Sequence, residues 1–103
     1  MAIAEVTVIP VGTASTSLSG YVAEIQRVLL EEQSSGSISF QLTAMSTIIE
    51  GEMDELLRVI RLIHELPFQT GAQRVCTNVK FDDRRDLKGT IKQKMNSVAD
   101  RMK

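Results

Sequence analysis

Strand-like and helix-like hydrophobic patterns follow one another along this chain in an order that leaves few possible folds. Residues alternate between polar and apolar, as in half-buried strands, in the ranges 3–9, 38–44 and 74–81, and the run 47–51 resembles a short buried strand. Apolar residues recur at helical spacing after residue 17, from Met53 onward and again toward the C-terminus. The resulting order is β-α-β-β-α-β followed by one more helix.

This order is the ferredoxin-like pattern. We therefore predict an α+β fold, with a ferredoxin-like βαββαβ antiparallel sheet, two helices on one face and an additional C-terminal helix. Ser15-Thr16-Ser17 offer capping hydroxyls to the first helix, and we expect the second helix to stop before Pro67. The terminal helix is expected to carry its apolar residues on one side: Leu87, Ile91, Met95, Val98 and Met102.

Length and composition limit the classes of function. The chain has 103 residues, and we expect one domain spanning residues 1–103. A formal net charge of -1 predicts neither a nucleic-acid partner nor a membrane surface, and no apolar run approaches the roughly 18 residues of a membrane span. One cysteine, Cys76, and an N-terminus unlike a signal peptide indicate a reducing compartment. We expect a cytoplasmic protein.

Alternation assigns mostly polar side chains to the sheet face away from the two main helices. These are Glu5, Thr7, Ser39, Gln41, Thr43, Arg74, Cys76, Asn78 and Lys80. The face of Glu50 stays open, because Ile48 and Ile49 are both apolar and either one is a suitable core residue. Such a face is either solvated, as is common on one-sided antiparallel sheets, or shared with another subunit. The terminal helix favours the second reading, since its methionines need a covering surface.

Several kinds of chemistry find little support. His64 is the one histidine and has no second ligand at metal-binding spacing, so we expect no metal. Cys76 lies within a strand, without the helix N-terminus that activates a thiol. The glycines do not cluster into a phosphate loop. Phe40 and Phe81 are expected on the helix side, which argues against stacking of RNA bases on the sheet.

A dense charge cluster, Asp82-Asp83-Arg84-Arg85-Asp86, follows the last strand. Local ion pairs in a solvated turn explain it most simply, because exposed pairs are common and weak. The alternative is that the arginines clamp an anion or a neighbouring subunit.

Three segments together resemble the thiamine-binding protein family of small ferredoxin-like domains. They are Val8-Ile9-Pro10-Val11-Gly12-Thr13; Thr47-Ile48-Ile49-Glu50-Gly51-Glu52 with Asp54-Glu55 and His64-Glu65; and the run from Gly71 to Asp86. The resemblance covers nearly the whole chain. It departs from the family at Ala44-Met45-Ser46-Thr47, where many members have Pro-Met-Gly-Thr.

The resemblance implies binding of thiamine, or of its hydroxymethylpyrimidine part, without catalysis and with no further cofactor. It also implies dimers that pair into tetramers. The implied ligand-binding residues are Thr47 and Glu50, with Ser17 and Thr77 as weaker candidates. Ser46 joins them, because it replaces a glycine in the loop next to Thr47.

The chemistry of Glu50 fits this ligand. A carboxylate meets the amine and ring nitrogens of an aminopyrimidine with charge-assisted hydrogen bonds, and it attracts the thiazolium cation. The rival hypothesis is a homo-oligomeric interaction module without a physiological small-molecule ligand, in which Glu50 is structural. An enzyme with Glu50 as general base requires a matched acid or nucleophile, and the sequence offers no convincing one.

Overall fold

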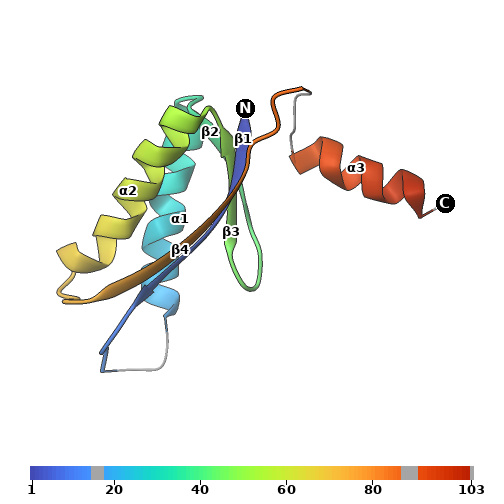
Figure 1. Ribbon diagram of the computed structural model, residues 1–103. Helices are drawn as coiled ribbons and strands as arrows, with labels where there is room; N and C mark the ends of the chain where they lie inside the picture. The colour runs from blue at the N-terminus through green and yellow to red at the C-terminus, as the bar shows by residue number, and fades with distance from the viewer. Residues whose placement is uncertain (15–17, 87–90, 103) are drawn as a thin grey trace.

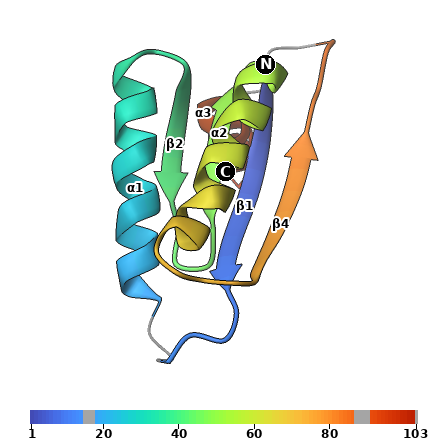
Figure 2. The same ribbon diagram turned by 90° about the vertical axis from the view of Figure 1, so that its left-hand side faces the viewer.

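The computed structural model describes residues 1–14, 18–86 and 91–102. Its elements are β1 (Ala2–Pro10), α1 (Ser19–Ser34), β2 (Ile38–Leu42), β3 (Thr47–Gly51), α2 (Met53–Gln69), β4 (Val75–Asp82) and α3 (Ile91–Arg101). The four strands form one sheet in the order β2-β3-β1-β4, and all neighbouring strands are antiparallel. Figure 2 shows β2, β1 and β4 in this order across the sheet, with α2 in front of it. This is the ferredoxin-like βαββαβ arrangement with an added C-terminal helix, and the prediction from the hydrophobic pattern is confirmed.

The helices lie on different sides of the sheet. Helices α1 and α2 cover one face, whereas α3 stands apart on the opposite side (Figure 1). The core fills the space between the sheet and the two main helices, where Leu29 of α1, Leu56 of α2 and Ile49 of β3 are fully buried. The other face is called the open face below.

Strand register decides which residues reach the open face. Ala4 of β1 pairs with Ile49 on one side and with Phe81 on the other. Directly paired residues point to the same face, so Ile49 enters the core with Ala4, and its neighbour Glu50 points the opposite way. Glu50 therefore lies on the open face, which answers the question that the sequence left open.

The hairpin between β2 and β3 is closed by hydroxyl groups. The backbone N–H of Thr43 donates to the carbonyl of Ser46 over 2.8 Å, and the Thr43 hydroxyl oxygen accepts from the Ser46 N–H over 3.0 Å. Of the described residues, only glycines have positive φ. Ser46 therefore takes the place of the family's glycine in this turn without entering the left-handed region.

Helix α2 runs past the proline at which we expected it to stop. It ends at Gln69 and includes Pro67 in its last turn. There the missing proline N–H removes one intrahelical bond, and the buried ring contributes apolar packing instead. Shorter-range bonds then close the helix, from the Thr70 N–H to the Pro67 carbonyl and from the Gly71 N–H to the Phe68 carbonyl.

One guanidinium joins the two main helices. Arg58 of α2 donates from Nη1 and Nη2 to the two carboxylate oxygens of Glu32 in α1, at 3.1 and 2.6 Å. It also contacts Glu55 on its own helix at 2.6 Å. This fork geometry is the strong form of an Arg–carboxylate pair. The hydrogen bond from Arg58 holds the pKa of Glu32 below its usual value, against the opposing effect of partial burial.

Acid is expected to abolish the contribution of Glu32 to stability. Its folded pKa is lowered, so the contribution is complete above the unfolded value near 4.5 and disappears as pH falls through the folded value. In urea titrations between pH 7 and pH 3, Glu32→Gln should be less stable than the wild type at pH 7, and the gap should close in acid. Glu31→Gln, at the exposed neighbouring position, is the control. A gap for Glu32→Gln that stays constant down to pH 3 would contradict this assignment.

Candidate functional site

Glu50 lies on the open face near the end of β3. Its direct neighbours across the sheet are Ile3 of β1 and Ser39 of β2, and its side chain is half-buried. Oε2 of Glu50 accepts a hydrogen bond from the backbone N–H of Ile91 over 2.7 Å. Ile91 is the first residue of α3, so the carboxylate meets a helix N-terminus, whose free N–H groups and dipole favour negative charge.

A second carboxylate, Glu5 of β1, lies close to Glu50 on the same face. Glu5 pairs directly with Ile48, two residues before Glu50, which makes the two acids diagonal neighbours about 7–8 Å apart. The hydroxyl of Ser46 donates to Oε2 of Glu5 over 3.2 Å. We call these residues, Ile3, Glu5, Ser46, Ile48 and Glu50, the open-face patch.

The open-face patch suits a cationic ligand that is flat and donates hydrogen bonds. Two carboxylates and a hydroxyl supply acceptors, and the half-buried Ile48 supplies an aliphatic floor, whereas Ile3 is 9% exposed. Among the described residues, Oε1 of Glu50 has no hydrogen-bond partner and stays available as an acceptor. Lys80 stands opposite Glu5 on β4 and reduces the negative charge on that side.

Helix α3 borders the open-face patch but packs weakly. None of its residues is buried, and the apolar Met95, Val98 and Met102 are 64%, 54% and 81% exposed. Besides the Glu50 contact, an ion pair of 2.5 Å joins Lys94 of α3 to Asp82 at the end of β4. Both contacts lie on the open-face side of the sheet.

The other candidate residues do not join Glu50. Thr47 points toward the helices, is 8% exposed and lies 3.4 Å from the side-chain amide of Gln26 in α1. Thr77 also faces the helices, and its hydroxyl lies 2.6 Å from Nδ1 of His64 in α2. Ser17 falls outside the described residues. Of the predicted ligand-binding residues, the structure thus places Glu50 and Ser46 on the open-face side, four residues apart along the chain, and turns Thr47 and Thr77 toward the helices.

The charge cluster after β4 forms pairs within itself. Arg84 binds Asp86 at 2.6 Å and Arg85 binds Asp83 at 2.9 Å, and these hydrogen bonds raise the pKa of each guanidinium. These pairs fit the simpler of the two readings, a surface turn with local ion pairs.

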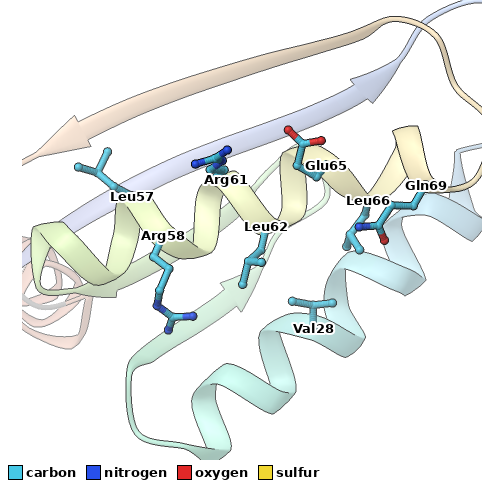
Figure 3. Close-up of a pocket in the computed structure, with 8 residues that line it drawn as sticks. All are labelled: Val28, Leu57, Arg58, Arg61, Leu62, Glu65, Leu66 and Gln69. Atoms are coloured by element: carbon cyan, nitrogen blue, oxygen red, sulfur yellow. The ribbon is translucent and has the colours of Figure 1, made fainter.

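A hollow of about 680 Å³ lies far from the open-face patch, on the outer surface of the helix layer (Figure 3). Val28 of α1 and Leu62 and Leu66 of α2 form its apolar part, and Arg58 and Arg61 stand along its side. Arg58 is already engaged by Glu32 and Glu55. The hollow has one acid, Glu65, and the other charged residues that line it are arginines, which stay protonated and cannot act as a general base.

The described residues form neither a metal-binding cluster nor a membrane-spanning helix. In the ranges 1–14, 18–86 and 91–102, no three histidine, cysteine or acidic side chains gather as a metal would require. None of the helices in the described part of the chain has the length and apolar character of a membrane span.

Sequence reasoning missed Glu5 and α3 as parts of the site. Glu5 was recognisable as an open-face residue by alternation, but nothing in the sequence indicated that it would neighbour Glu50 diagonally. The contact of Glu50 with Ile91 joins residues 41 positions apart and depends on where α3 turns back, which no local pattern specifies.

Comparisons with known proteins agree with the fold. The sequence model of a family described as "Thiamine-binding protein" matches residues 4–99. The UPF0045 protein YqgV of Bacillus subtilis is 54% identical over 98 residues, which cover 95% of this chain and 94% of that protein. The crystal structure of hypothetical protein MJ1052 of Methanocaldococcus jannaschii superposes with a TM-score of 0.82 at 30% identity and covers 95% of both chains. A Thermotoga maritima protein, provisionally assigned to thiamine biosynthesis or salvage, superposes with a TM-score of 0.65 over 94% of this chain and 97% of its own. It is 20% identical, so this likeness concerns the fold alone.

Proposed function

Because this chain belongs to the thiamine-binding protein family, we propose that it binds thiamine, or the hydroxymethylpyrimidine part of thiamine, without catalysing a reaction. We further propose that it does so in the cytoplasm, as a carrier, buffer or sensor. The observation that carries the proposal is the half-buried carboxylate of Glu50 on the open face, with Oε1 available as an acceptor.

The ligand chemistry fits the residues around Glu50. The pyrimidine has an exocyclic amine beside a ring nitrogen, and a carboxylate that shares a proton with this nitrogen binds both in a charge-assisted manner. Ile48, which is half-buried, offers an aliphatic surface for the ring. Glu5 adds a second negative charge close to where the thiazolium cation would lie, and Ser46 holds the Glu5 carboxylate in place.

Isothermal titration calorimetry tests this proposal. Thiamine and hydroxymethylpyrimidine are each titrated into the folded full-length chain. Saturable binding of both supports recognition through the pyrimidine, whereas binding of thiamine alone moves the recognition to the thiazolium. Absence of heat with both ligands, confirmed by the absence of a shift in melting temperature, would reject the proposal.

A second candidate function, self-association, is favoured by α3. Helix α3 lies on the open-face side, and its apolar stripe of Met95, Val98 and Met102 is not covered by the sheet of its own chain. The sheet in turn exposes Ile9, whose side chain is 41% exposed. A second copy of the chain can cover both surfaces, because the stripe of each copy can pack against the apolar sheet residues of the other. We therefore propose that the chain self-associates as a dimer or tetramer through this side.

Adding charge to the stripe is expected to break this assembly. Met95→Lys with Val98→Lys should lower the mass found by sedimentation equilibrium toward that of one chain, because charges buried without partners are costly. The double variant Asn96→Lys with Ser97→Lys adds the same charge at exposed polar positions of the same helix and serves as the control. Equal masses for both double variants and the wild type would contradict an interface built on the stripe.

A further inference from the structure

Glu50 makes one contact that a binding residue does not need. Its Oε2 is occupied by the N–H of Ile91, which begins α3, so the candidate ligand-binding carboxylate also holds a helix of the same chain. The first N–H groups of a helix have no partner within the helix, so α3 gains an acceptor from this contact. The ligand and the N-terminus of α3 therefore donate hydrogen bonds to the same carboxylate.

The aminopyrimidine edge requires both oxygens of that carboxylate. Its exocyclic amine and adjacent ring nitrogen lie side by side, and a planar pair of parallel hydrogen bonds places one nitrogen on each oxygen. Oε1 of Glu50 is available, whereas Oε2 faces the first turn of α3 at 2.7 Å. A pyrimidine ring that lies in the plane of the carboxylate therefore competes with the Ile91 N–H for Oε2.

Helix α3 contacts the sheet without burying any of its described residues. An ion pair also joins Lys94 of α3 to Asp82 of β4, and the side chains of Lys94 and Asp82 are 47% and 51% exposed. Exposed ion pairs are weak, and elements with few buried contacts open at low cost in free energy.

We propose that α3 and the ligand compete for Glu50, so that binding of an aminopyrimidine or a similar amidine-like cation releases the N-terminus of α3 from the sheet. This inference rests on the proposed ligand binding. Ligand binding at the open-face patch would then change the surface of the protein, because a released α3 moves the apolar stripe of Met95, Val98 and Met102 away from its present position. By linkage, whatever holds α3 at Glu50 weakens ligand binding by the same factor.

The competition predicts that loosening α3 tightens binding. Lys94→Ala removes the ion pair with Asp82 and leaves Glu50 intact. We expect thiamine to bind this variant about two- to fivefold more tightly than the wild type, because the helix then occupies Glu50 for a smaller fraction of the time. Lys92→Ala removes the same charge from an exposed position of α3 and should leave the affinity unchanged.

Nuclear magnetic resonance of the full-length chain tests the contact itself. The Ile91 amide proton should shift upfield when thiamine saturates the protein, and the heteronuclear NOE of the amides 91–101 should fall. Without ligand, Glu50→Ala should produce both changes, whereas Glu52→Ala, at the exposed neighbouring acid, should produce neither.

The outcomes separate the inference from the proposed function. If Glu50→Ala leaves the Ile91 amide unchanged, Glu50 does not hold α3 and the inference is overturned, whatever thiamine does. Thiamine binding that leaves α3 as ordered as before, or Lys94→Ala binding no more tightly than Lys92→Ala, also overturns it while the proposed function stands. If thiamine produces neither heat nor shift, the proposed function fails and the competition fails with it, even where Glu50→Ala releases the helix.

Discussion

Replacing Glu50 by glutamine is expected to weaken thiamine binding by about one to two orders of magnitude, as for loss of a hydrogen bond to a charged group. Glutamine keeps the shape of the side chain and one acceptor oxygen, so the contact with the Ile91 N–H need not be lost. It removes the negative charge that would share a proton with the pyrimidine. The fold should be unaffected, since Glu50 points away from the core and α3 contributes no buried residue. Calorimetry gives the affinity and thermal unfolding checks the fold.

Two control variants make the result specific. Glu52→Gln removes an acid that is 75% exposed, and it should bind as the wild type does. Thr47→Val changes a buried residue of the same strand that points to the opposite face, and it should change the dissociation constant less than Glu50→Gln. Equal affinity of Glu50→Gln and the wild type would remove Glu50 from the site. A larger effect at Thr47 would move the ligand to the helix side of the sheet.

Leu29→Ala is expected to lower the free energy of unfolding by about 2–5 kcal/mol, because it removes a fully buried side chain and leaves a cavity in the core. Total stabilities of small domains are about 5–15 kcal/mol, so this loss is a large share. The melting temperature should fall by about 10 °C or more. Chemical denaturation with urea gives the change in free energy directly.

The adjacent Leu30 provides a matched control. It lies on the same helix but is 55% exposed, so Leu30→Ala should change stability by about 0.5 kcal/mol or less. Leu29→Ala should still bind thiamine with the wild-type dissociation constant where it remains folded, because Leu29 packs on the face away from Glu50. Similar melting temperatures for the two alanine variants would mean that the core does not lie where the structure has it.

Much of the fold was predictable from local patterns. The alternation in β1 predicted Glu5 and Thr7 on the open face, and the register confirms this assignment. The order of strand-like and helix-like hydrophobic patterns identified the ferredoxin-like arrangement, because few topologies accommodate this order of elements with a short hairpin in the middle. Helix ends were less predictable. Pro67 lies inside α2, since packing of its buried ring overrides the local preference against proline.

The candidate site depended on information that is not local. In β3, Ile48 and Ile49 are both apolar, so the hydrophobic pattern does not say which of them faces the core. Only the pairing of Ile49 with Ala4 places Ile49 in the core and Glu50 on the open face. The terminal apolar stripe predicted a helix but not where it lies. The sequence by itself thus determined the elements, their order and the inward side of most strands, because these follow from hydrophobic period. The tertiary structure alone decided the face of Glu50 and its contact with α3, because strand register and the return of a distant helix depend on the whole packed sheet.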